Sequence, residues 1–529
     1  MTANALLSKE AIEGYRQQGL WNAATLVELA NQARGPHPAV VCQRNGTITY
    51  SEMNEEASRL SQALADEGIG PGSVVCLQIP NWYEFVLSHL ALTHLGAVTL
   101  PVLPSFRSKE LEYIINTAQV SAVIGSPTFG SSPELSLYME LAERCPSLRF
   151  WWAAEDPEEG VRRRAGAASD RTPDVVNFDD LTILVATSGT TGDPKLVGHS
   201  HRSTLGGVLG KIAREIVGLT EDDVILMPSP LSHMTGLLYG VRMTILLGAT
   251  LVLMDRWEPE QAADLMERHQ VTYMQGATPF LFDLVRTDPK RTERLASLSY
   301  FTCGGAPIPE TLAQSAVERF PQISLMAAWG LSETGTVTLV RPDDPIGKVT
   351  GTDGATVPGW EVRIVDSEGE PVEVGQEGEI ECRGAALFHG YYMKRDLTES
   401  AMRNGWFRTG DRGRLDQDGY LRCLDRLKDI VIRGGLNISP IEIEELLRRH
   451  PKVKDVAVVG TPDDRLGERI CAVVVPDGVA PSLDEVVQFL TKMGLSKQKL
   501  PESIVEVGEL PTSPTGKVQK FLLRKGLAG

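Results

Sequence analysis

The chain has 529 residues, which is too long for one ordinary domain and predicts two or more hydrophobic cores. Hydrophobic residues make up 42% and charged residues 23%, a balance that excludes a disordered or fibrous protein. Lys and Arg total 52 against 69 Asp and Glu, and the net charge of -17 argues against a broad basic face for nucleic acid or anionic lipid.

Cysteine usage and the N-terminus indicate the compartment. The seven cysteines are scattered without a CxxC pair, which favours a reducing compartment and suggests neither a disulfide framework nor a zinc site. Acidic residues follow the N-terminus too early for a signal peptide. The most apolar stretch, residues 85–104, contains Ser88, His89 and His94 and ends in prolines, so we expect a buried helix and strand there. These features predict a cytoplasmic protein without a membrane span.

The first third of the chain has the pattern of an α/β domain. Residues 51–125 alternate helical patterns with short apolar runs, which is typical of βαβ units and a parallel sheet, and the alternation resumes after residue 180. Residues 154–174 between these regions are charged and rich in turn residues, so they are predicted to form a surface connection.

The pattern changes twice in the last third. Residues 355–424 consist of short alternating strands with turn dipeptides, which predicts a small β barrel or meander. After Lys428 follows a compact α+β pattern of roughly 100 residues. It includes a helix for which Ser439 is the expected N-cap and Pro440 lies in the first turn.

The segment LTILVATSGTTGDPK has the strongest chemical signal. An apolar strand runs into Thr187, Ser188, Gly189, Thr190, Thr191, Gly192 and then Lys195. Glycines let backbone N–H groups approach phosphate oxygens, hydroxyls add donors, and the lysine supplies charge. The Walker pattern is not met, because Leu196 follows the lysine and the glycine spacing differs. For this segment alone, a flexible surface loop remains the alternative.

Four further motifs follow in order. They are AAWGLSETG (327–335), WFRTGDRGRLDQDGY (406–420), LDRLKDIVIRGGLNISPIEIE (424–444) and PTSPTGKVQK (511–520). With these motifs the chain resembles, over nearly its whole length, the adenylate-forming superfamily of acyl-CoA synthetases, carrier-protein-loading adenylation domains and firefly-type luciferases. It is most similar to a medium-chain, alicyclic or aryl acyl-CoA ligase.

The resemblance implies a fold of α/β and α+β parts. Residues 1–427 would form a large N-terminal domain of stacked α/β sheets plus a small β barrel, and residues 428–529 a small mobile α+β domain. It also implies an AMP-forming acid–thiol ligase with ATP, Mg²⁺ and coenzyme A. A carboxylic acid would attack the α-phosphate of ATP, and the acyl-AMP would then pass its acyl group to the thiol of coenzyme A or of a carrier protein. A homodimer is common in the family.

The resemblance also assigns roles to individual residues. Lys517 would be the catalytic lysine, Glu333 the magnesium ligand, His233 a residue beside the acyl pocket, and Lys428 the hinge. The nucleotide and coenzyme A sites would be formed by Thr187, Ser188, Gly189, Thr190, Thr191, Lys195, Gly305, Ala306, Ala328, Trp329, Gly330, Ser332, Asp411, Arg426, Gly434 and Gly435.

Structural roles are the alternatives for several of these residues. Lys517 could be a solvated lysine, the SET triplet a helix cap, and His233 a satisfied core histidine. Asp411 and Arg426, which match residues that hold the ribose hydroxyls, could each form a salt bridge at a turn.

One residue departs from the family pattern, which usually has glycine after the loop lysine. Leu196 at that position would restrict φ and add bulk beside the loop, so an enzyme that mainly converts a preformed acyl-adenylate to the thioester stays an alternative. A carrier-protein-loading enzyme, a luciferase-type oxygenase and a nucleotide-sensing module without turnover are the others.

The sequence does not specify the acid. The segments near His233, Tyr273–Phe282 and Cys303–Ala306 are mostly apolar, which favours a neutral aliphatic, alicyclic or aryl body over an amino acid. Asp283 is the nearest acidic residue to them.

Overall fold

The chain divides into two compact units, which are described separately. The first contains Met1–Thr350, Gly354–Glu361 and Cys382–Phe407, and the second contains Gly351–Asp353, Val362–Glu381 and Arg408–Gly529. The computed structural model describes residues 9–21, 24–44, 46–126, 135–153, 178–187, 194–292, 295–306, 308–426, 429–433, 436–463, 465–512 and 518–527. The predicted surface connection at residues 154–174 lies outside the described residues.

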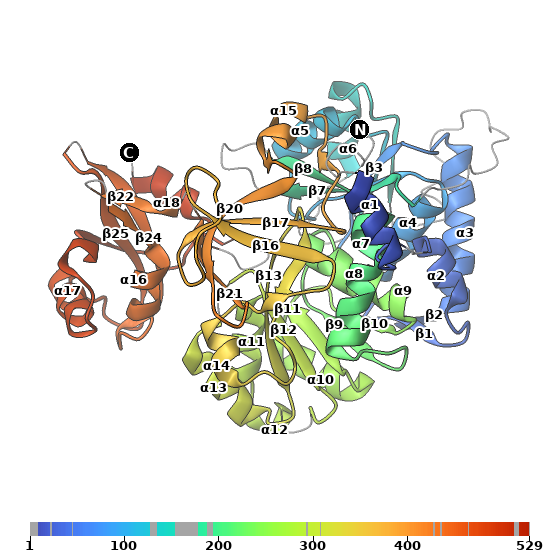
Figure 1. Cartoon of the computed structure of the whole chain (residues 1–529). Helices are drawn as coiled ribbons and strands as arrows, with labels where there is room; N and C mark the ends of the chain where they lie inside the picture. The colour runs from blue at the N-terminus through green and yellow to red at the C-terminus, as the bar shows by residue number, and fades with distance from the viewer. Residues whose placement is uncertain are drawn as a thin grey trace. The chain divides into compact units, whose positions relative to one another are not determined.

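The first unit contains a nine-stranded sheet (Figure 1). Its strands, in spatial order, are β15 (Ala355–Thr356), β14 (Gly335–Leu339), β13 (Ser324–Leu331), β12 (Tyr300–Gly304), β11 (Tyr273–Gly276), β9 (Val224–Met227), β10 (Thr250–Leu253), β1 (Pro38–Cys42) and β2 (Gly46–Thr49). The central strands β13, β12, β11, β9, β10 and β1 are parallel, and the outer pairs are antiparallel.

A seven-stranded sheet also belongs to the first unit. Its order is β18 (Gly390–Tyr391), β8 (Lys195–Ser200), β7 (Leu181–Thr187), β4 (Val98–Pro101), β3 (Val74–Gln78), β5 (Ala122–Gly125) and β6 (Phe150–Ala153). Strands β3, β4 and β5 pair in parallel, which confirms the βαβ prediction for residues 51–125. Helix α4 (Tyr83–His94) and strand β4 are buried, as predicted for the apolar stretch 85–104.

The region of short strands forms a third sheet. Its order is β16 (Trp360–Val365), β17 (Gly378–Gly384), β20 (Trp406–Leu415) and β19 (Met402–Arg403), and β21 (Leu421–Arg426) pairs with β20. The pairs of β20 with β19 and β21 are antiparallel, as the turn dipeptides between short strands predict.

The end of the chain contains a fourth sheet within the second unit. It consists of β23 (Leu436–Ile438), β22 (Val431–Arg433), β25 (Gly467–Pro476) and β24 (Val453–Asp463), with β26 (Ser503–Glu506) beside β25. Helix α16 (Pro440–Leu447) begins where the sequence predicts, since the Ser439 side chain accepts a hydrogen bond from the Glu442 amide at 3.3 Å.

The remaining helices connect these strands. Those of the N-terminal region are α1 (Lys9–Gln17), α2 (Leu26–Gln32), α3 (Tyr50–Asp66), α5 (Ser108–Ala118), α6 (Leu135–Arg144), α7 (His201–Leu205), α8 (Gly207–Gly210), η3 (Lys211–Val217), η4 (Gly236–Arg242), α9 (Met243–Leu247), α10 (Pro259–His269), α11 (Thr278–Arg286), α12 (Pro289–Thr292), α13 (Glu310–Arg319), α14 (Ile346–Gly351) and α15 (Arg395–Ser400). Those near the C-terminus are α17 (Leu483–Lys492), η6 (Lys497–Lys499) and α18 (Lys520–Leu527).

Separate hydrophobic cores stabilise the sheets. Helices α10, α11 and α13 pack against the nine-stranded sheet, where they lie together in Figure 1. Helices α5 and α6 pack against the seven-stranded sheet. In the second unit, α16 and α17 cover one set of buried valines and isoleucines, and Leu523 of α18 packs in another. Burial of this apolar surface is the main favourable contribution to folding.

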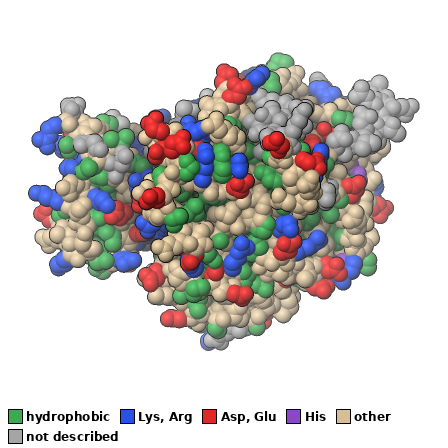
Figure 2. All heavy atoms as spheres, viewed as in Figure 1, with side chains coloured by type: hydrophobic (Ala, Val, Ile, Leu, Met, Phe, Trp, Pro, Cys, Tyr) green, Lys and Arg blue, Asp and Glu red, His purple; other side chains and the backbone are tan. Residues whose placement is uncertain are grey.

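The distribution of charged side chains on the surface can be compared with the sequence, which argues against a broad basic face. On the face shown in Figure 2, acidic and basic side chains of the described residues are interspersed, and neither sign forms one continuous patch. Among the described residues, no helix is long and apolar enough to cross a bilayer.

Candidate active site

The glycine-rich loop connects two paired strands. Strands β7 and β8 form an antiparallel hairpin in which Thr187 pairs with Lys195. Ser188, Gly189, Thr190 and Thr191 lie outside the described residues. Thr187 and Lys195 are half-buried, and the Thr187 hydroxyl donates to the Lys195 carbonyl at 3.4 Å. The hairpin therefore holds both ends of the predicted phosphate loop together.

Leu196 lies within strand β8 and not in the loop. Its backbone pairs with Ala186, and it is absent from the positions with positive φ. Its side chain is 2% exposed and packs in the core with Leu184 and Val98. Its φ lies in the range that leucine adopts in a strand, so the predicted restriction of φ has no cost there. The prediction that Leu196 adds bulk beside the loop is wrong, because side chains alternate along a strand and this one faces the core.

We expect Leu196→Gly to destabilise the protein without improving its chemistry. Removing a buried leucine from a strand leaves a cavity and adds backbone freedom, so the free energy of unfolding should fall by about 3–5 kcal/mol. Denaturant titration measures this loss, and acid-dependent pyrophosphate exchange per folded enzyme should stay within about twofold of wild type. An exchange rate that rises about tenfold in the glycine variant would show that the leucine does restrict the loop.

The SET triplet forms a tight turn between β13 and β14 and not a helix cap. The Thr334 hydroxyl accepts from the Leu331 amide at 3.0 Å, and the Thr334 amide donates to the Leu331 carbonyl at 3.1 Å. A Cβ on Gly330 would overlap the Gly335 carbonyl oxygen, so only glycine fits at this position. The turn leaves Ser332 and Glu333 half-buried at the end of the nine-stranded sheet.

Several contacts join this turn to the seven-stranded sheet. The Glu333 carbonyl accepts from the Phe388 amide at 2.9 Å, and the Tyr391 hydroxyl donates to Glu333 Oε1 at 2.8 Å. Lys195 Nζ lies 4.9 Å from the centroid of the Tyr391 ring. Lys195 and Glu333, predicted from separate motifs, are therefore brought together by a third side chain. Sequence reasoning missed Tyr391, because nothing in the FHGYYMK segment distinguishes this tyrosine from the next one.

Other predicted residues lie at or directly after the carboxyl ends of adjacent parallel strands. Strands β9, β11, β12 and β13 are neighbours in the sheet, and in such sheets ligands bind at this edge. Gly304 ends β12 opposite Ala328 of β13, and Gly305 and Ala306 follow directly. Trp329 is 7% exposed. The strand order thus places the segments after β9, β11, β12 and β13, all predicted to shape the acyl and adenine pockets, side by side.

His233 lies in the connection after β9. It is half-buried, and its Nδ1 accepts from the Thr235 amide at 3.3 Å. The preceding turn is fixed by Asn81, whose side chain donates to the Ser229 carbonyl at 3.1 Å and accepts from the Leu231 amide at 2.8 Å. The role of His233 beside the acyl pocket stays a prediction, and Asn81 is a supporting residue of this turn that the sequence did not suggest.

The side chains of the candidate acyl segments are engaged within the protein. The Tyr273 hydroxyl donates toward Gln275 Oε1 at 2.7 Å and lies 3.2 Å from the Thr302 hydroxyl. Asp283 accepts from Trp257 Nε1 at 2.9 Å. Burial raises the pKa of the Cys303 thiol, so it stays protonated. Asp283 thus already has a donor, which weakens it as a partner for a substrate ammonium.

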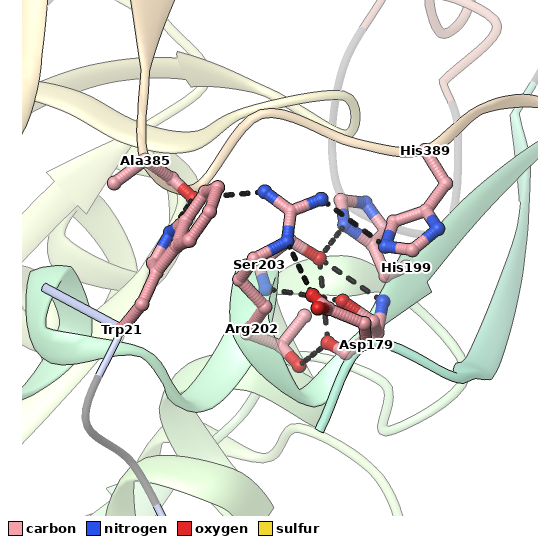
Figure 3. A network of polar contacts seen from close by, with 9 residues as sticks. Trp21, Asp179, His199, Arg202, Ser203, Ala385 and His389 are labelled. Atoms are coloured by element: carbon pink, nitrogen blue, oxygen red, sulfur yellow. Dashed lines mark hydrogen bonds and ion pairs between the residues drawn. The ribbon is translucent and has the colours of Figure 1, made fainter. Parts of the chain in front are cut away.

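A buried polar network around His199 and Arg202 is shown in Figure 3, and it contacts the SET turn through the Ser332 carbonyl. His199 of β8 donates from Nε2 to the Ser332 carbonyl at 2.7 Å, and its Nδ1 contacts the Ser203 hydroxyl at 3.0 Å. Arg202 of α7 donates to His389 Nε2 at 3.3 Å and pairs with Asp179 at 2.9 Å. Figure 3 shows the Arg202 guanidinium between the Trp21 and His389 side chains.

The histidines of this network are neutral at physiological pH. Burial lowers the pKa of His199 to about 4, with Arg242 and Arg202 acting in the same direction. Burial and then Arg202 lower the pKa of His389 to about 3. A neutral His199 has one ring N–H, and the Ser332 carbonyl requires it at Nε2, so Nδ1 accepts from the Ser203 hydroxyl.

The second unit contains the predicted ribose pair. Asp411 and Arg426 are partners across β20 and β21, and Arg426 Nε lies 3.1 Å from Asp411 Oδ1. The Asp411 side chain is 5% exposed and that of Arg426 is 34% exposed. The salt bridge joins paired strands and not the ends of a turn, so it holds the carboxylate in a fixed position.

The predicted residues of the C-terminal region lie outside the described part of the chain: Lys428, Gly434, Gly435 and Lys517. Thr512 and Val518, on either side of residues 513–517, form a β-bridge. Lys520 Nζ lies 2.7 Å from Glu444 Oε1, and Arg524 pairs with Asp429 at 3.2 Å. Helix α18, which follows Lys517, is thus anchored by two ion pairs.

The side chains present fit a magnesium ion that arrives with a nucleotide. Among the described residues, no group of three or more His, Cys, Asp or Glu could hold a metal ion by itself. Mg²⁺ commonly binds through one or two carboxylates plus substrate phosphates and water. Glu333 is a single carboxylate of this kind, and it contacts the same tyrosine, Tyr391, as Lys195 does.

Comparison with known proteins identifies the family. A model of the AMP-binding enzyme family matches residues 27–392, and a model of the AMP-binding enzyme C-terminal domain matches residues 442–517. The chain belongs to the AMP-binding enzyme family, which confirms the resemblance to adenylate-forming enzymes.

The similar proteins cover nearly the whole chain. The chain is 36% identical to the medium-chain fatty-acid–CoA ligase of Escherichia coli (strain K12), over 100% of this chain and 94% of that protein. It is 33% identical to pyochelin synthase PchD of Pseudomonas aeruginosa (strain UCBPP-PA14), over 98% and 95%. The crystal structure of ATP-bound MatB from Rhodopseudomonas palustris superposes with a TM-score of 0.84 at 28% identity, over 95% and 98% of the two chains. The predicted fold class is confirmed by this match.

Proposed function

We propose that the protein is an AMP-forming acyl-CoA ligase. It activates a carboxylic acid with ATP to an acyl-AMP, releasing pyrophosphate, and transfers the acyl group to the thiol of coenzyme A, releasing AMP. The observation that carries the proposal is the meeting of Lys195 and Glu333 around Tyr391, beside the phosphate-loop hairpin of an AMP-binding enzyme. A carboxylate and a triphosphate repel each other because both are negative. A lysine and a carboxylate that can hold a metal ion, close to the same tyrosine, would neutralise part of that charge.

In the first step, charges must be neutralised as the acid approaches phosphorus. Lys195 and the loop residues Ser188, Gly189, Thr190 and Thr191 hold the phosphates, and Lys517 bridges the carboxylate and phosphate oxygens. The Glu333 carboxylate would hold Mg²⁺, which supplies positive charge to the phosphate oxygens when bound. The Ser332 hydroxyl contacts the nucleotide phosphate, and His199 fixes the backbone of that residue.

The nucleoside is assigned to residues of several of the predicted motifs. Asp411 accepts hydrogen bonds from the vicinal hydroxyls of the ribose, and Arg426 keeps its carboxylate in place. Gly305, Ala306, Ala328, Trp329 and Gly330 form the adenine and acyl walls. Gly305 and Ala306 follow β12, and Ala328, Trp329 and Gly330 lie in the C-terminal half of the adjacent parallel strand β13, which supports this assignment.

The second step uses a separate C-terminal domain. We propose residues 1–427 and 428–529 as the two domains, with Lys428 as the hinge and Gly434 and Gly435 along the pantetheine channel. The second unit contains all of residues 428–529, and the C-terminal family model matches within them. Coenzyme A would be the acceptor in this step.

The acid is proposed to be a neutral, medium-sized carboxylic acid. The candidate acyl segments are apolar, and the nearest carboxylate, Asp283, is held by Trp257. An amino acid would need a free acidic partner for its ammonium group. The similarity to a medium-chain fatty-acid–CoA ligase over the whole chain supports the same class.

Loading of a carrier protein is the second candidate. Two relatives at 33% identity each are named as a synthase and a synthetase and not as CoA ligases: pyochelin synthase PchD and triostin synthetase I. The nucleotide site would be the same, and only the thiol acceptor would differ.

Two assays on the purified protein test these proposals. Pyrophosphate exchange with acids from acetate to dodecanoate and with benzoates should depend on acid and Mg²⁺. Mass spectrometry should then detect an acyl-CoA when coenzyme A is added, and a phosphopantetheinylated carrier protein should replace it poorly. Exchange without acyl-CoA but with acyl-carrier product would favour the second candidate. No exchange with any acid would reject the first step altogether.

A further inference from the structure

Tyr391 contacts two oppositely charged groups at once. Its hydroxyl donates to Glu333 Oε1 at 2.8 Å, and Lys195 Nζ lies 4.9 Å from the centroid of its ring. A hydrogen bond to a carboxylate is stronger than one between neutral groups, and an ammonium within about 6 Å of an aromatic ring is attracted to it. One side chain thus offers each charge a partner of its own.

Without such a spacer the two charges would be expected to pair. An ammonium and a carboxylate in a half-buried site attract each other more strongly than in bulk water. Among the described residues, no carboxylate oxygen lies within the 4.0 Å limit of an ion pair from Lys195 Nζ. The tyrosine therefore keeps both groups available for a ligand.

The position of Tyr391 is set by its own surroundings and not by the two charges. The residue is 5% exposed, and its backbone pairs with Val197 of β8. Its amide donates to the Thr398 hydroxyl at 2.9 Å. Its ring packs edge-on against the Phe388 ring, with 5.1 Å between the ring centroids. The preceding Gly390 has a φ of +125°, and a Cβ there would crowd Thr398. Because packing holds the ring in place, the ring can position Lys195 and Glu333.

We propose that Tyr391 is a positioning residue for adenylation. It holds Lys195 and Glu333 apart and orients the Glu333 carboxylate by occupying one oxygen, which leaves the other for the magnesium of MgATP. Lys195 is left free to meet the nucleotide phosphates. This inference rests on the proposed function, because it assigns Lys195 to phosphate and Glu333 to magnesium.

The test compares two variants that each lose one tyrosine hydroxyl, at neighbouring positions. Tyr391→Phe keeps the ring beside Lys195 and removes only the donor to Glu333. Tyr392→Phe is the matched control, since its ring packs against the core of the seven-stranded sheet. Binding of Mn²⁺ with a non-hydrolysable ATP analogue, followed by electron paramagnetic resonance, reports the metal site without turnover. Mg²⁺ dependence of pyrophosphate exchange reports adenylation.

We expect Tyr391→Phe to weaken Mn²⁺ binding in the nucleotide complex about fivefold to tenfold. The Mg²⁺ concentration for half-maximal exchange should rise by a similar factor, while Tyr392→Phe stays within twofold of wild type. Thioester formation from a supplied acyl-AMP should change less than twofold in both variants. In an E333Q background, Tyr391→Phe should have less than a twofold further effect on the exchange rate, because the carboxylate it orients is gone.

The possible results distinguish a wrong role for Tyr391 from a wrong proposed function. If wild type binds Mn²⁺ with the analogue and exchanges pyrophosphate, but Tyr391→Phe matches it in both measurements, the inference is wrong and the proposed function stands. If wild type itself neither binds the metal–nucleotide complex nor exchanges pyrophosphate, both are wrong. A loss of equal size in Tyr391→Phe with and without Glu333 would also overturn the inference, since it would indicate a purely structural role.

Discussion

Replacing Lys517 by alanine should lower acid-dependent pyrophosphate exchange by about 10²–10³-fold. The lysine is assigned to the point where carboxylate and phosphate oxygens approach, and loss of one preorganised group that stabilises developing charge commonly costs this much. Thioester formation from a supplied acyl-AMP should remain within about threefold of wild type, because the phosphorus centre no longer reacts in that step. The two rates are measured on the same preparation.

Lys525→Ala is the matched control for this experiment. Lys525 is an exposed lysine of α18, the helix that follows Lys517 in the sequence. Its removal changes the net charge equally, so any general effect of charge on nucleotide binding would be seen in both variants. Exchange in Lys517→Ala within threefold of the Lys525→Ala rate would show that another cation performs the first step.

Replacing Arg202 by alanine should lower the free energy of unfolding by about 3–5 kcal/mol, or the midpoint of the thermal transition by roughly 3–6 °C. Arg202 is 2% exposed, lies 4.5 Å from the Trp21 ring centroid and hydrogen-bonds Asp179, Ala385 and His389. Its truncation leaves a cavity and removes the donor to the neutral His389. Scanning calorimetry measures the shift.

Two variants identify the source of that loss. Arg202→Met keeps most of the side-chain volume but neither the charge nor the hydrogen bonds, so it should recover about half of the lost stability if packing and polar contacts contribute equally. Arg59→Ala removes an arginine whose side chain is 70% exposed, and it should change stability by less than about 0.5 kcal/mol. An Arg202→Ala transition as high as that of Arg59→Ala would show that the buried network contributes little.

Much of the fold could be predicted because local patterns were consistent with it. Ser439 was expected as an N-cap, and its side chain accepts a hydrogen bond from the Glu442 amide. The apolar stretch at residues 85–104 is a buried helix and strand, as predicted. Periodicity and capping are properties of neighbouring residues, so they are visible without knowledge of the rest of the chain.

The direction of the Leu196 side chain could not be predicted from neighbouring residues. The sequence predicted its side chain beside the phosphate loop, whereas pairing of Ala186 with Leu196 makes it part of strand β8 and turns its side chain into the core. A shift of one residue in that pairing would reverse the side chain's direction, and register is decided by the partner strand.

The sequence by itself determined the family, the order of the motifs and the residue types available for phosphate chemistry, since these depend on composition and spacing along the chain. Only the tertiary structure decided which side chains meet. Tyr391 and Glu333 are separated by 58 positions, and His199 and Ser332 by 133. Contacts at such separations are fixed by strand order and register, which depend on packing of the whole sheet and not on any local segment.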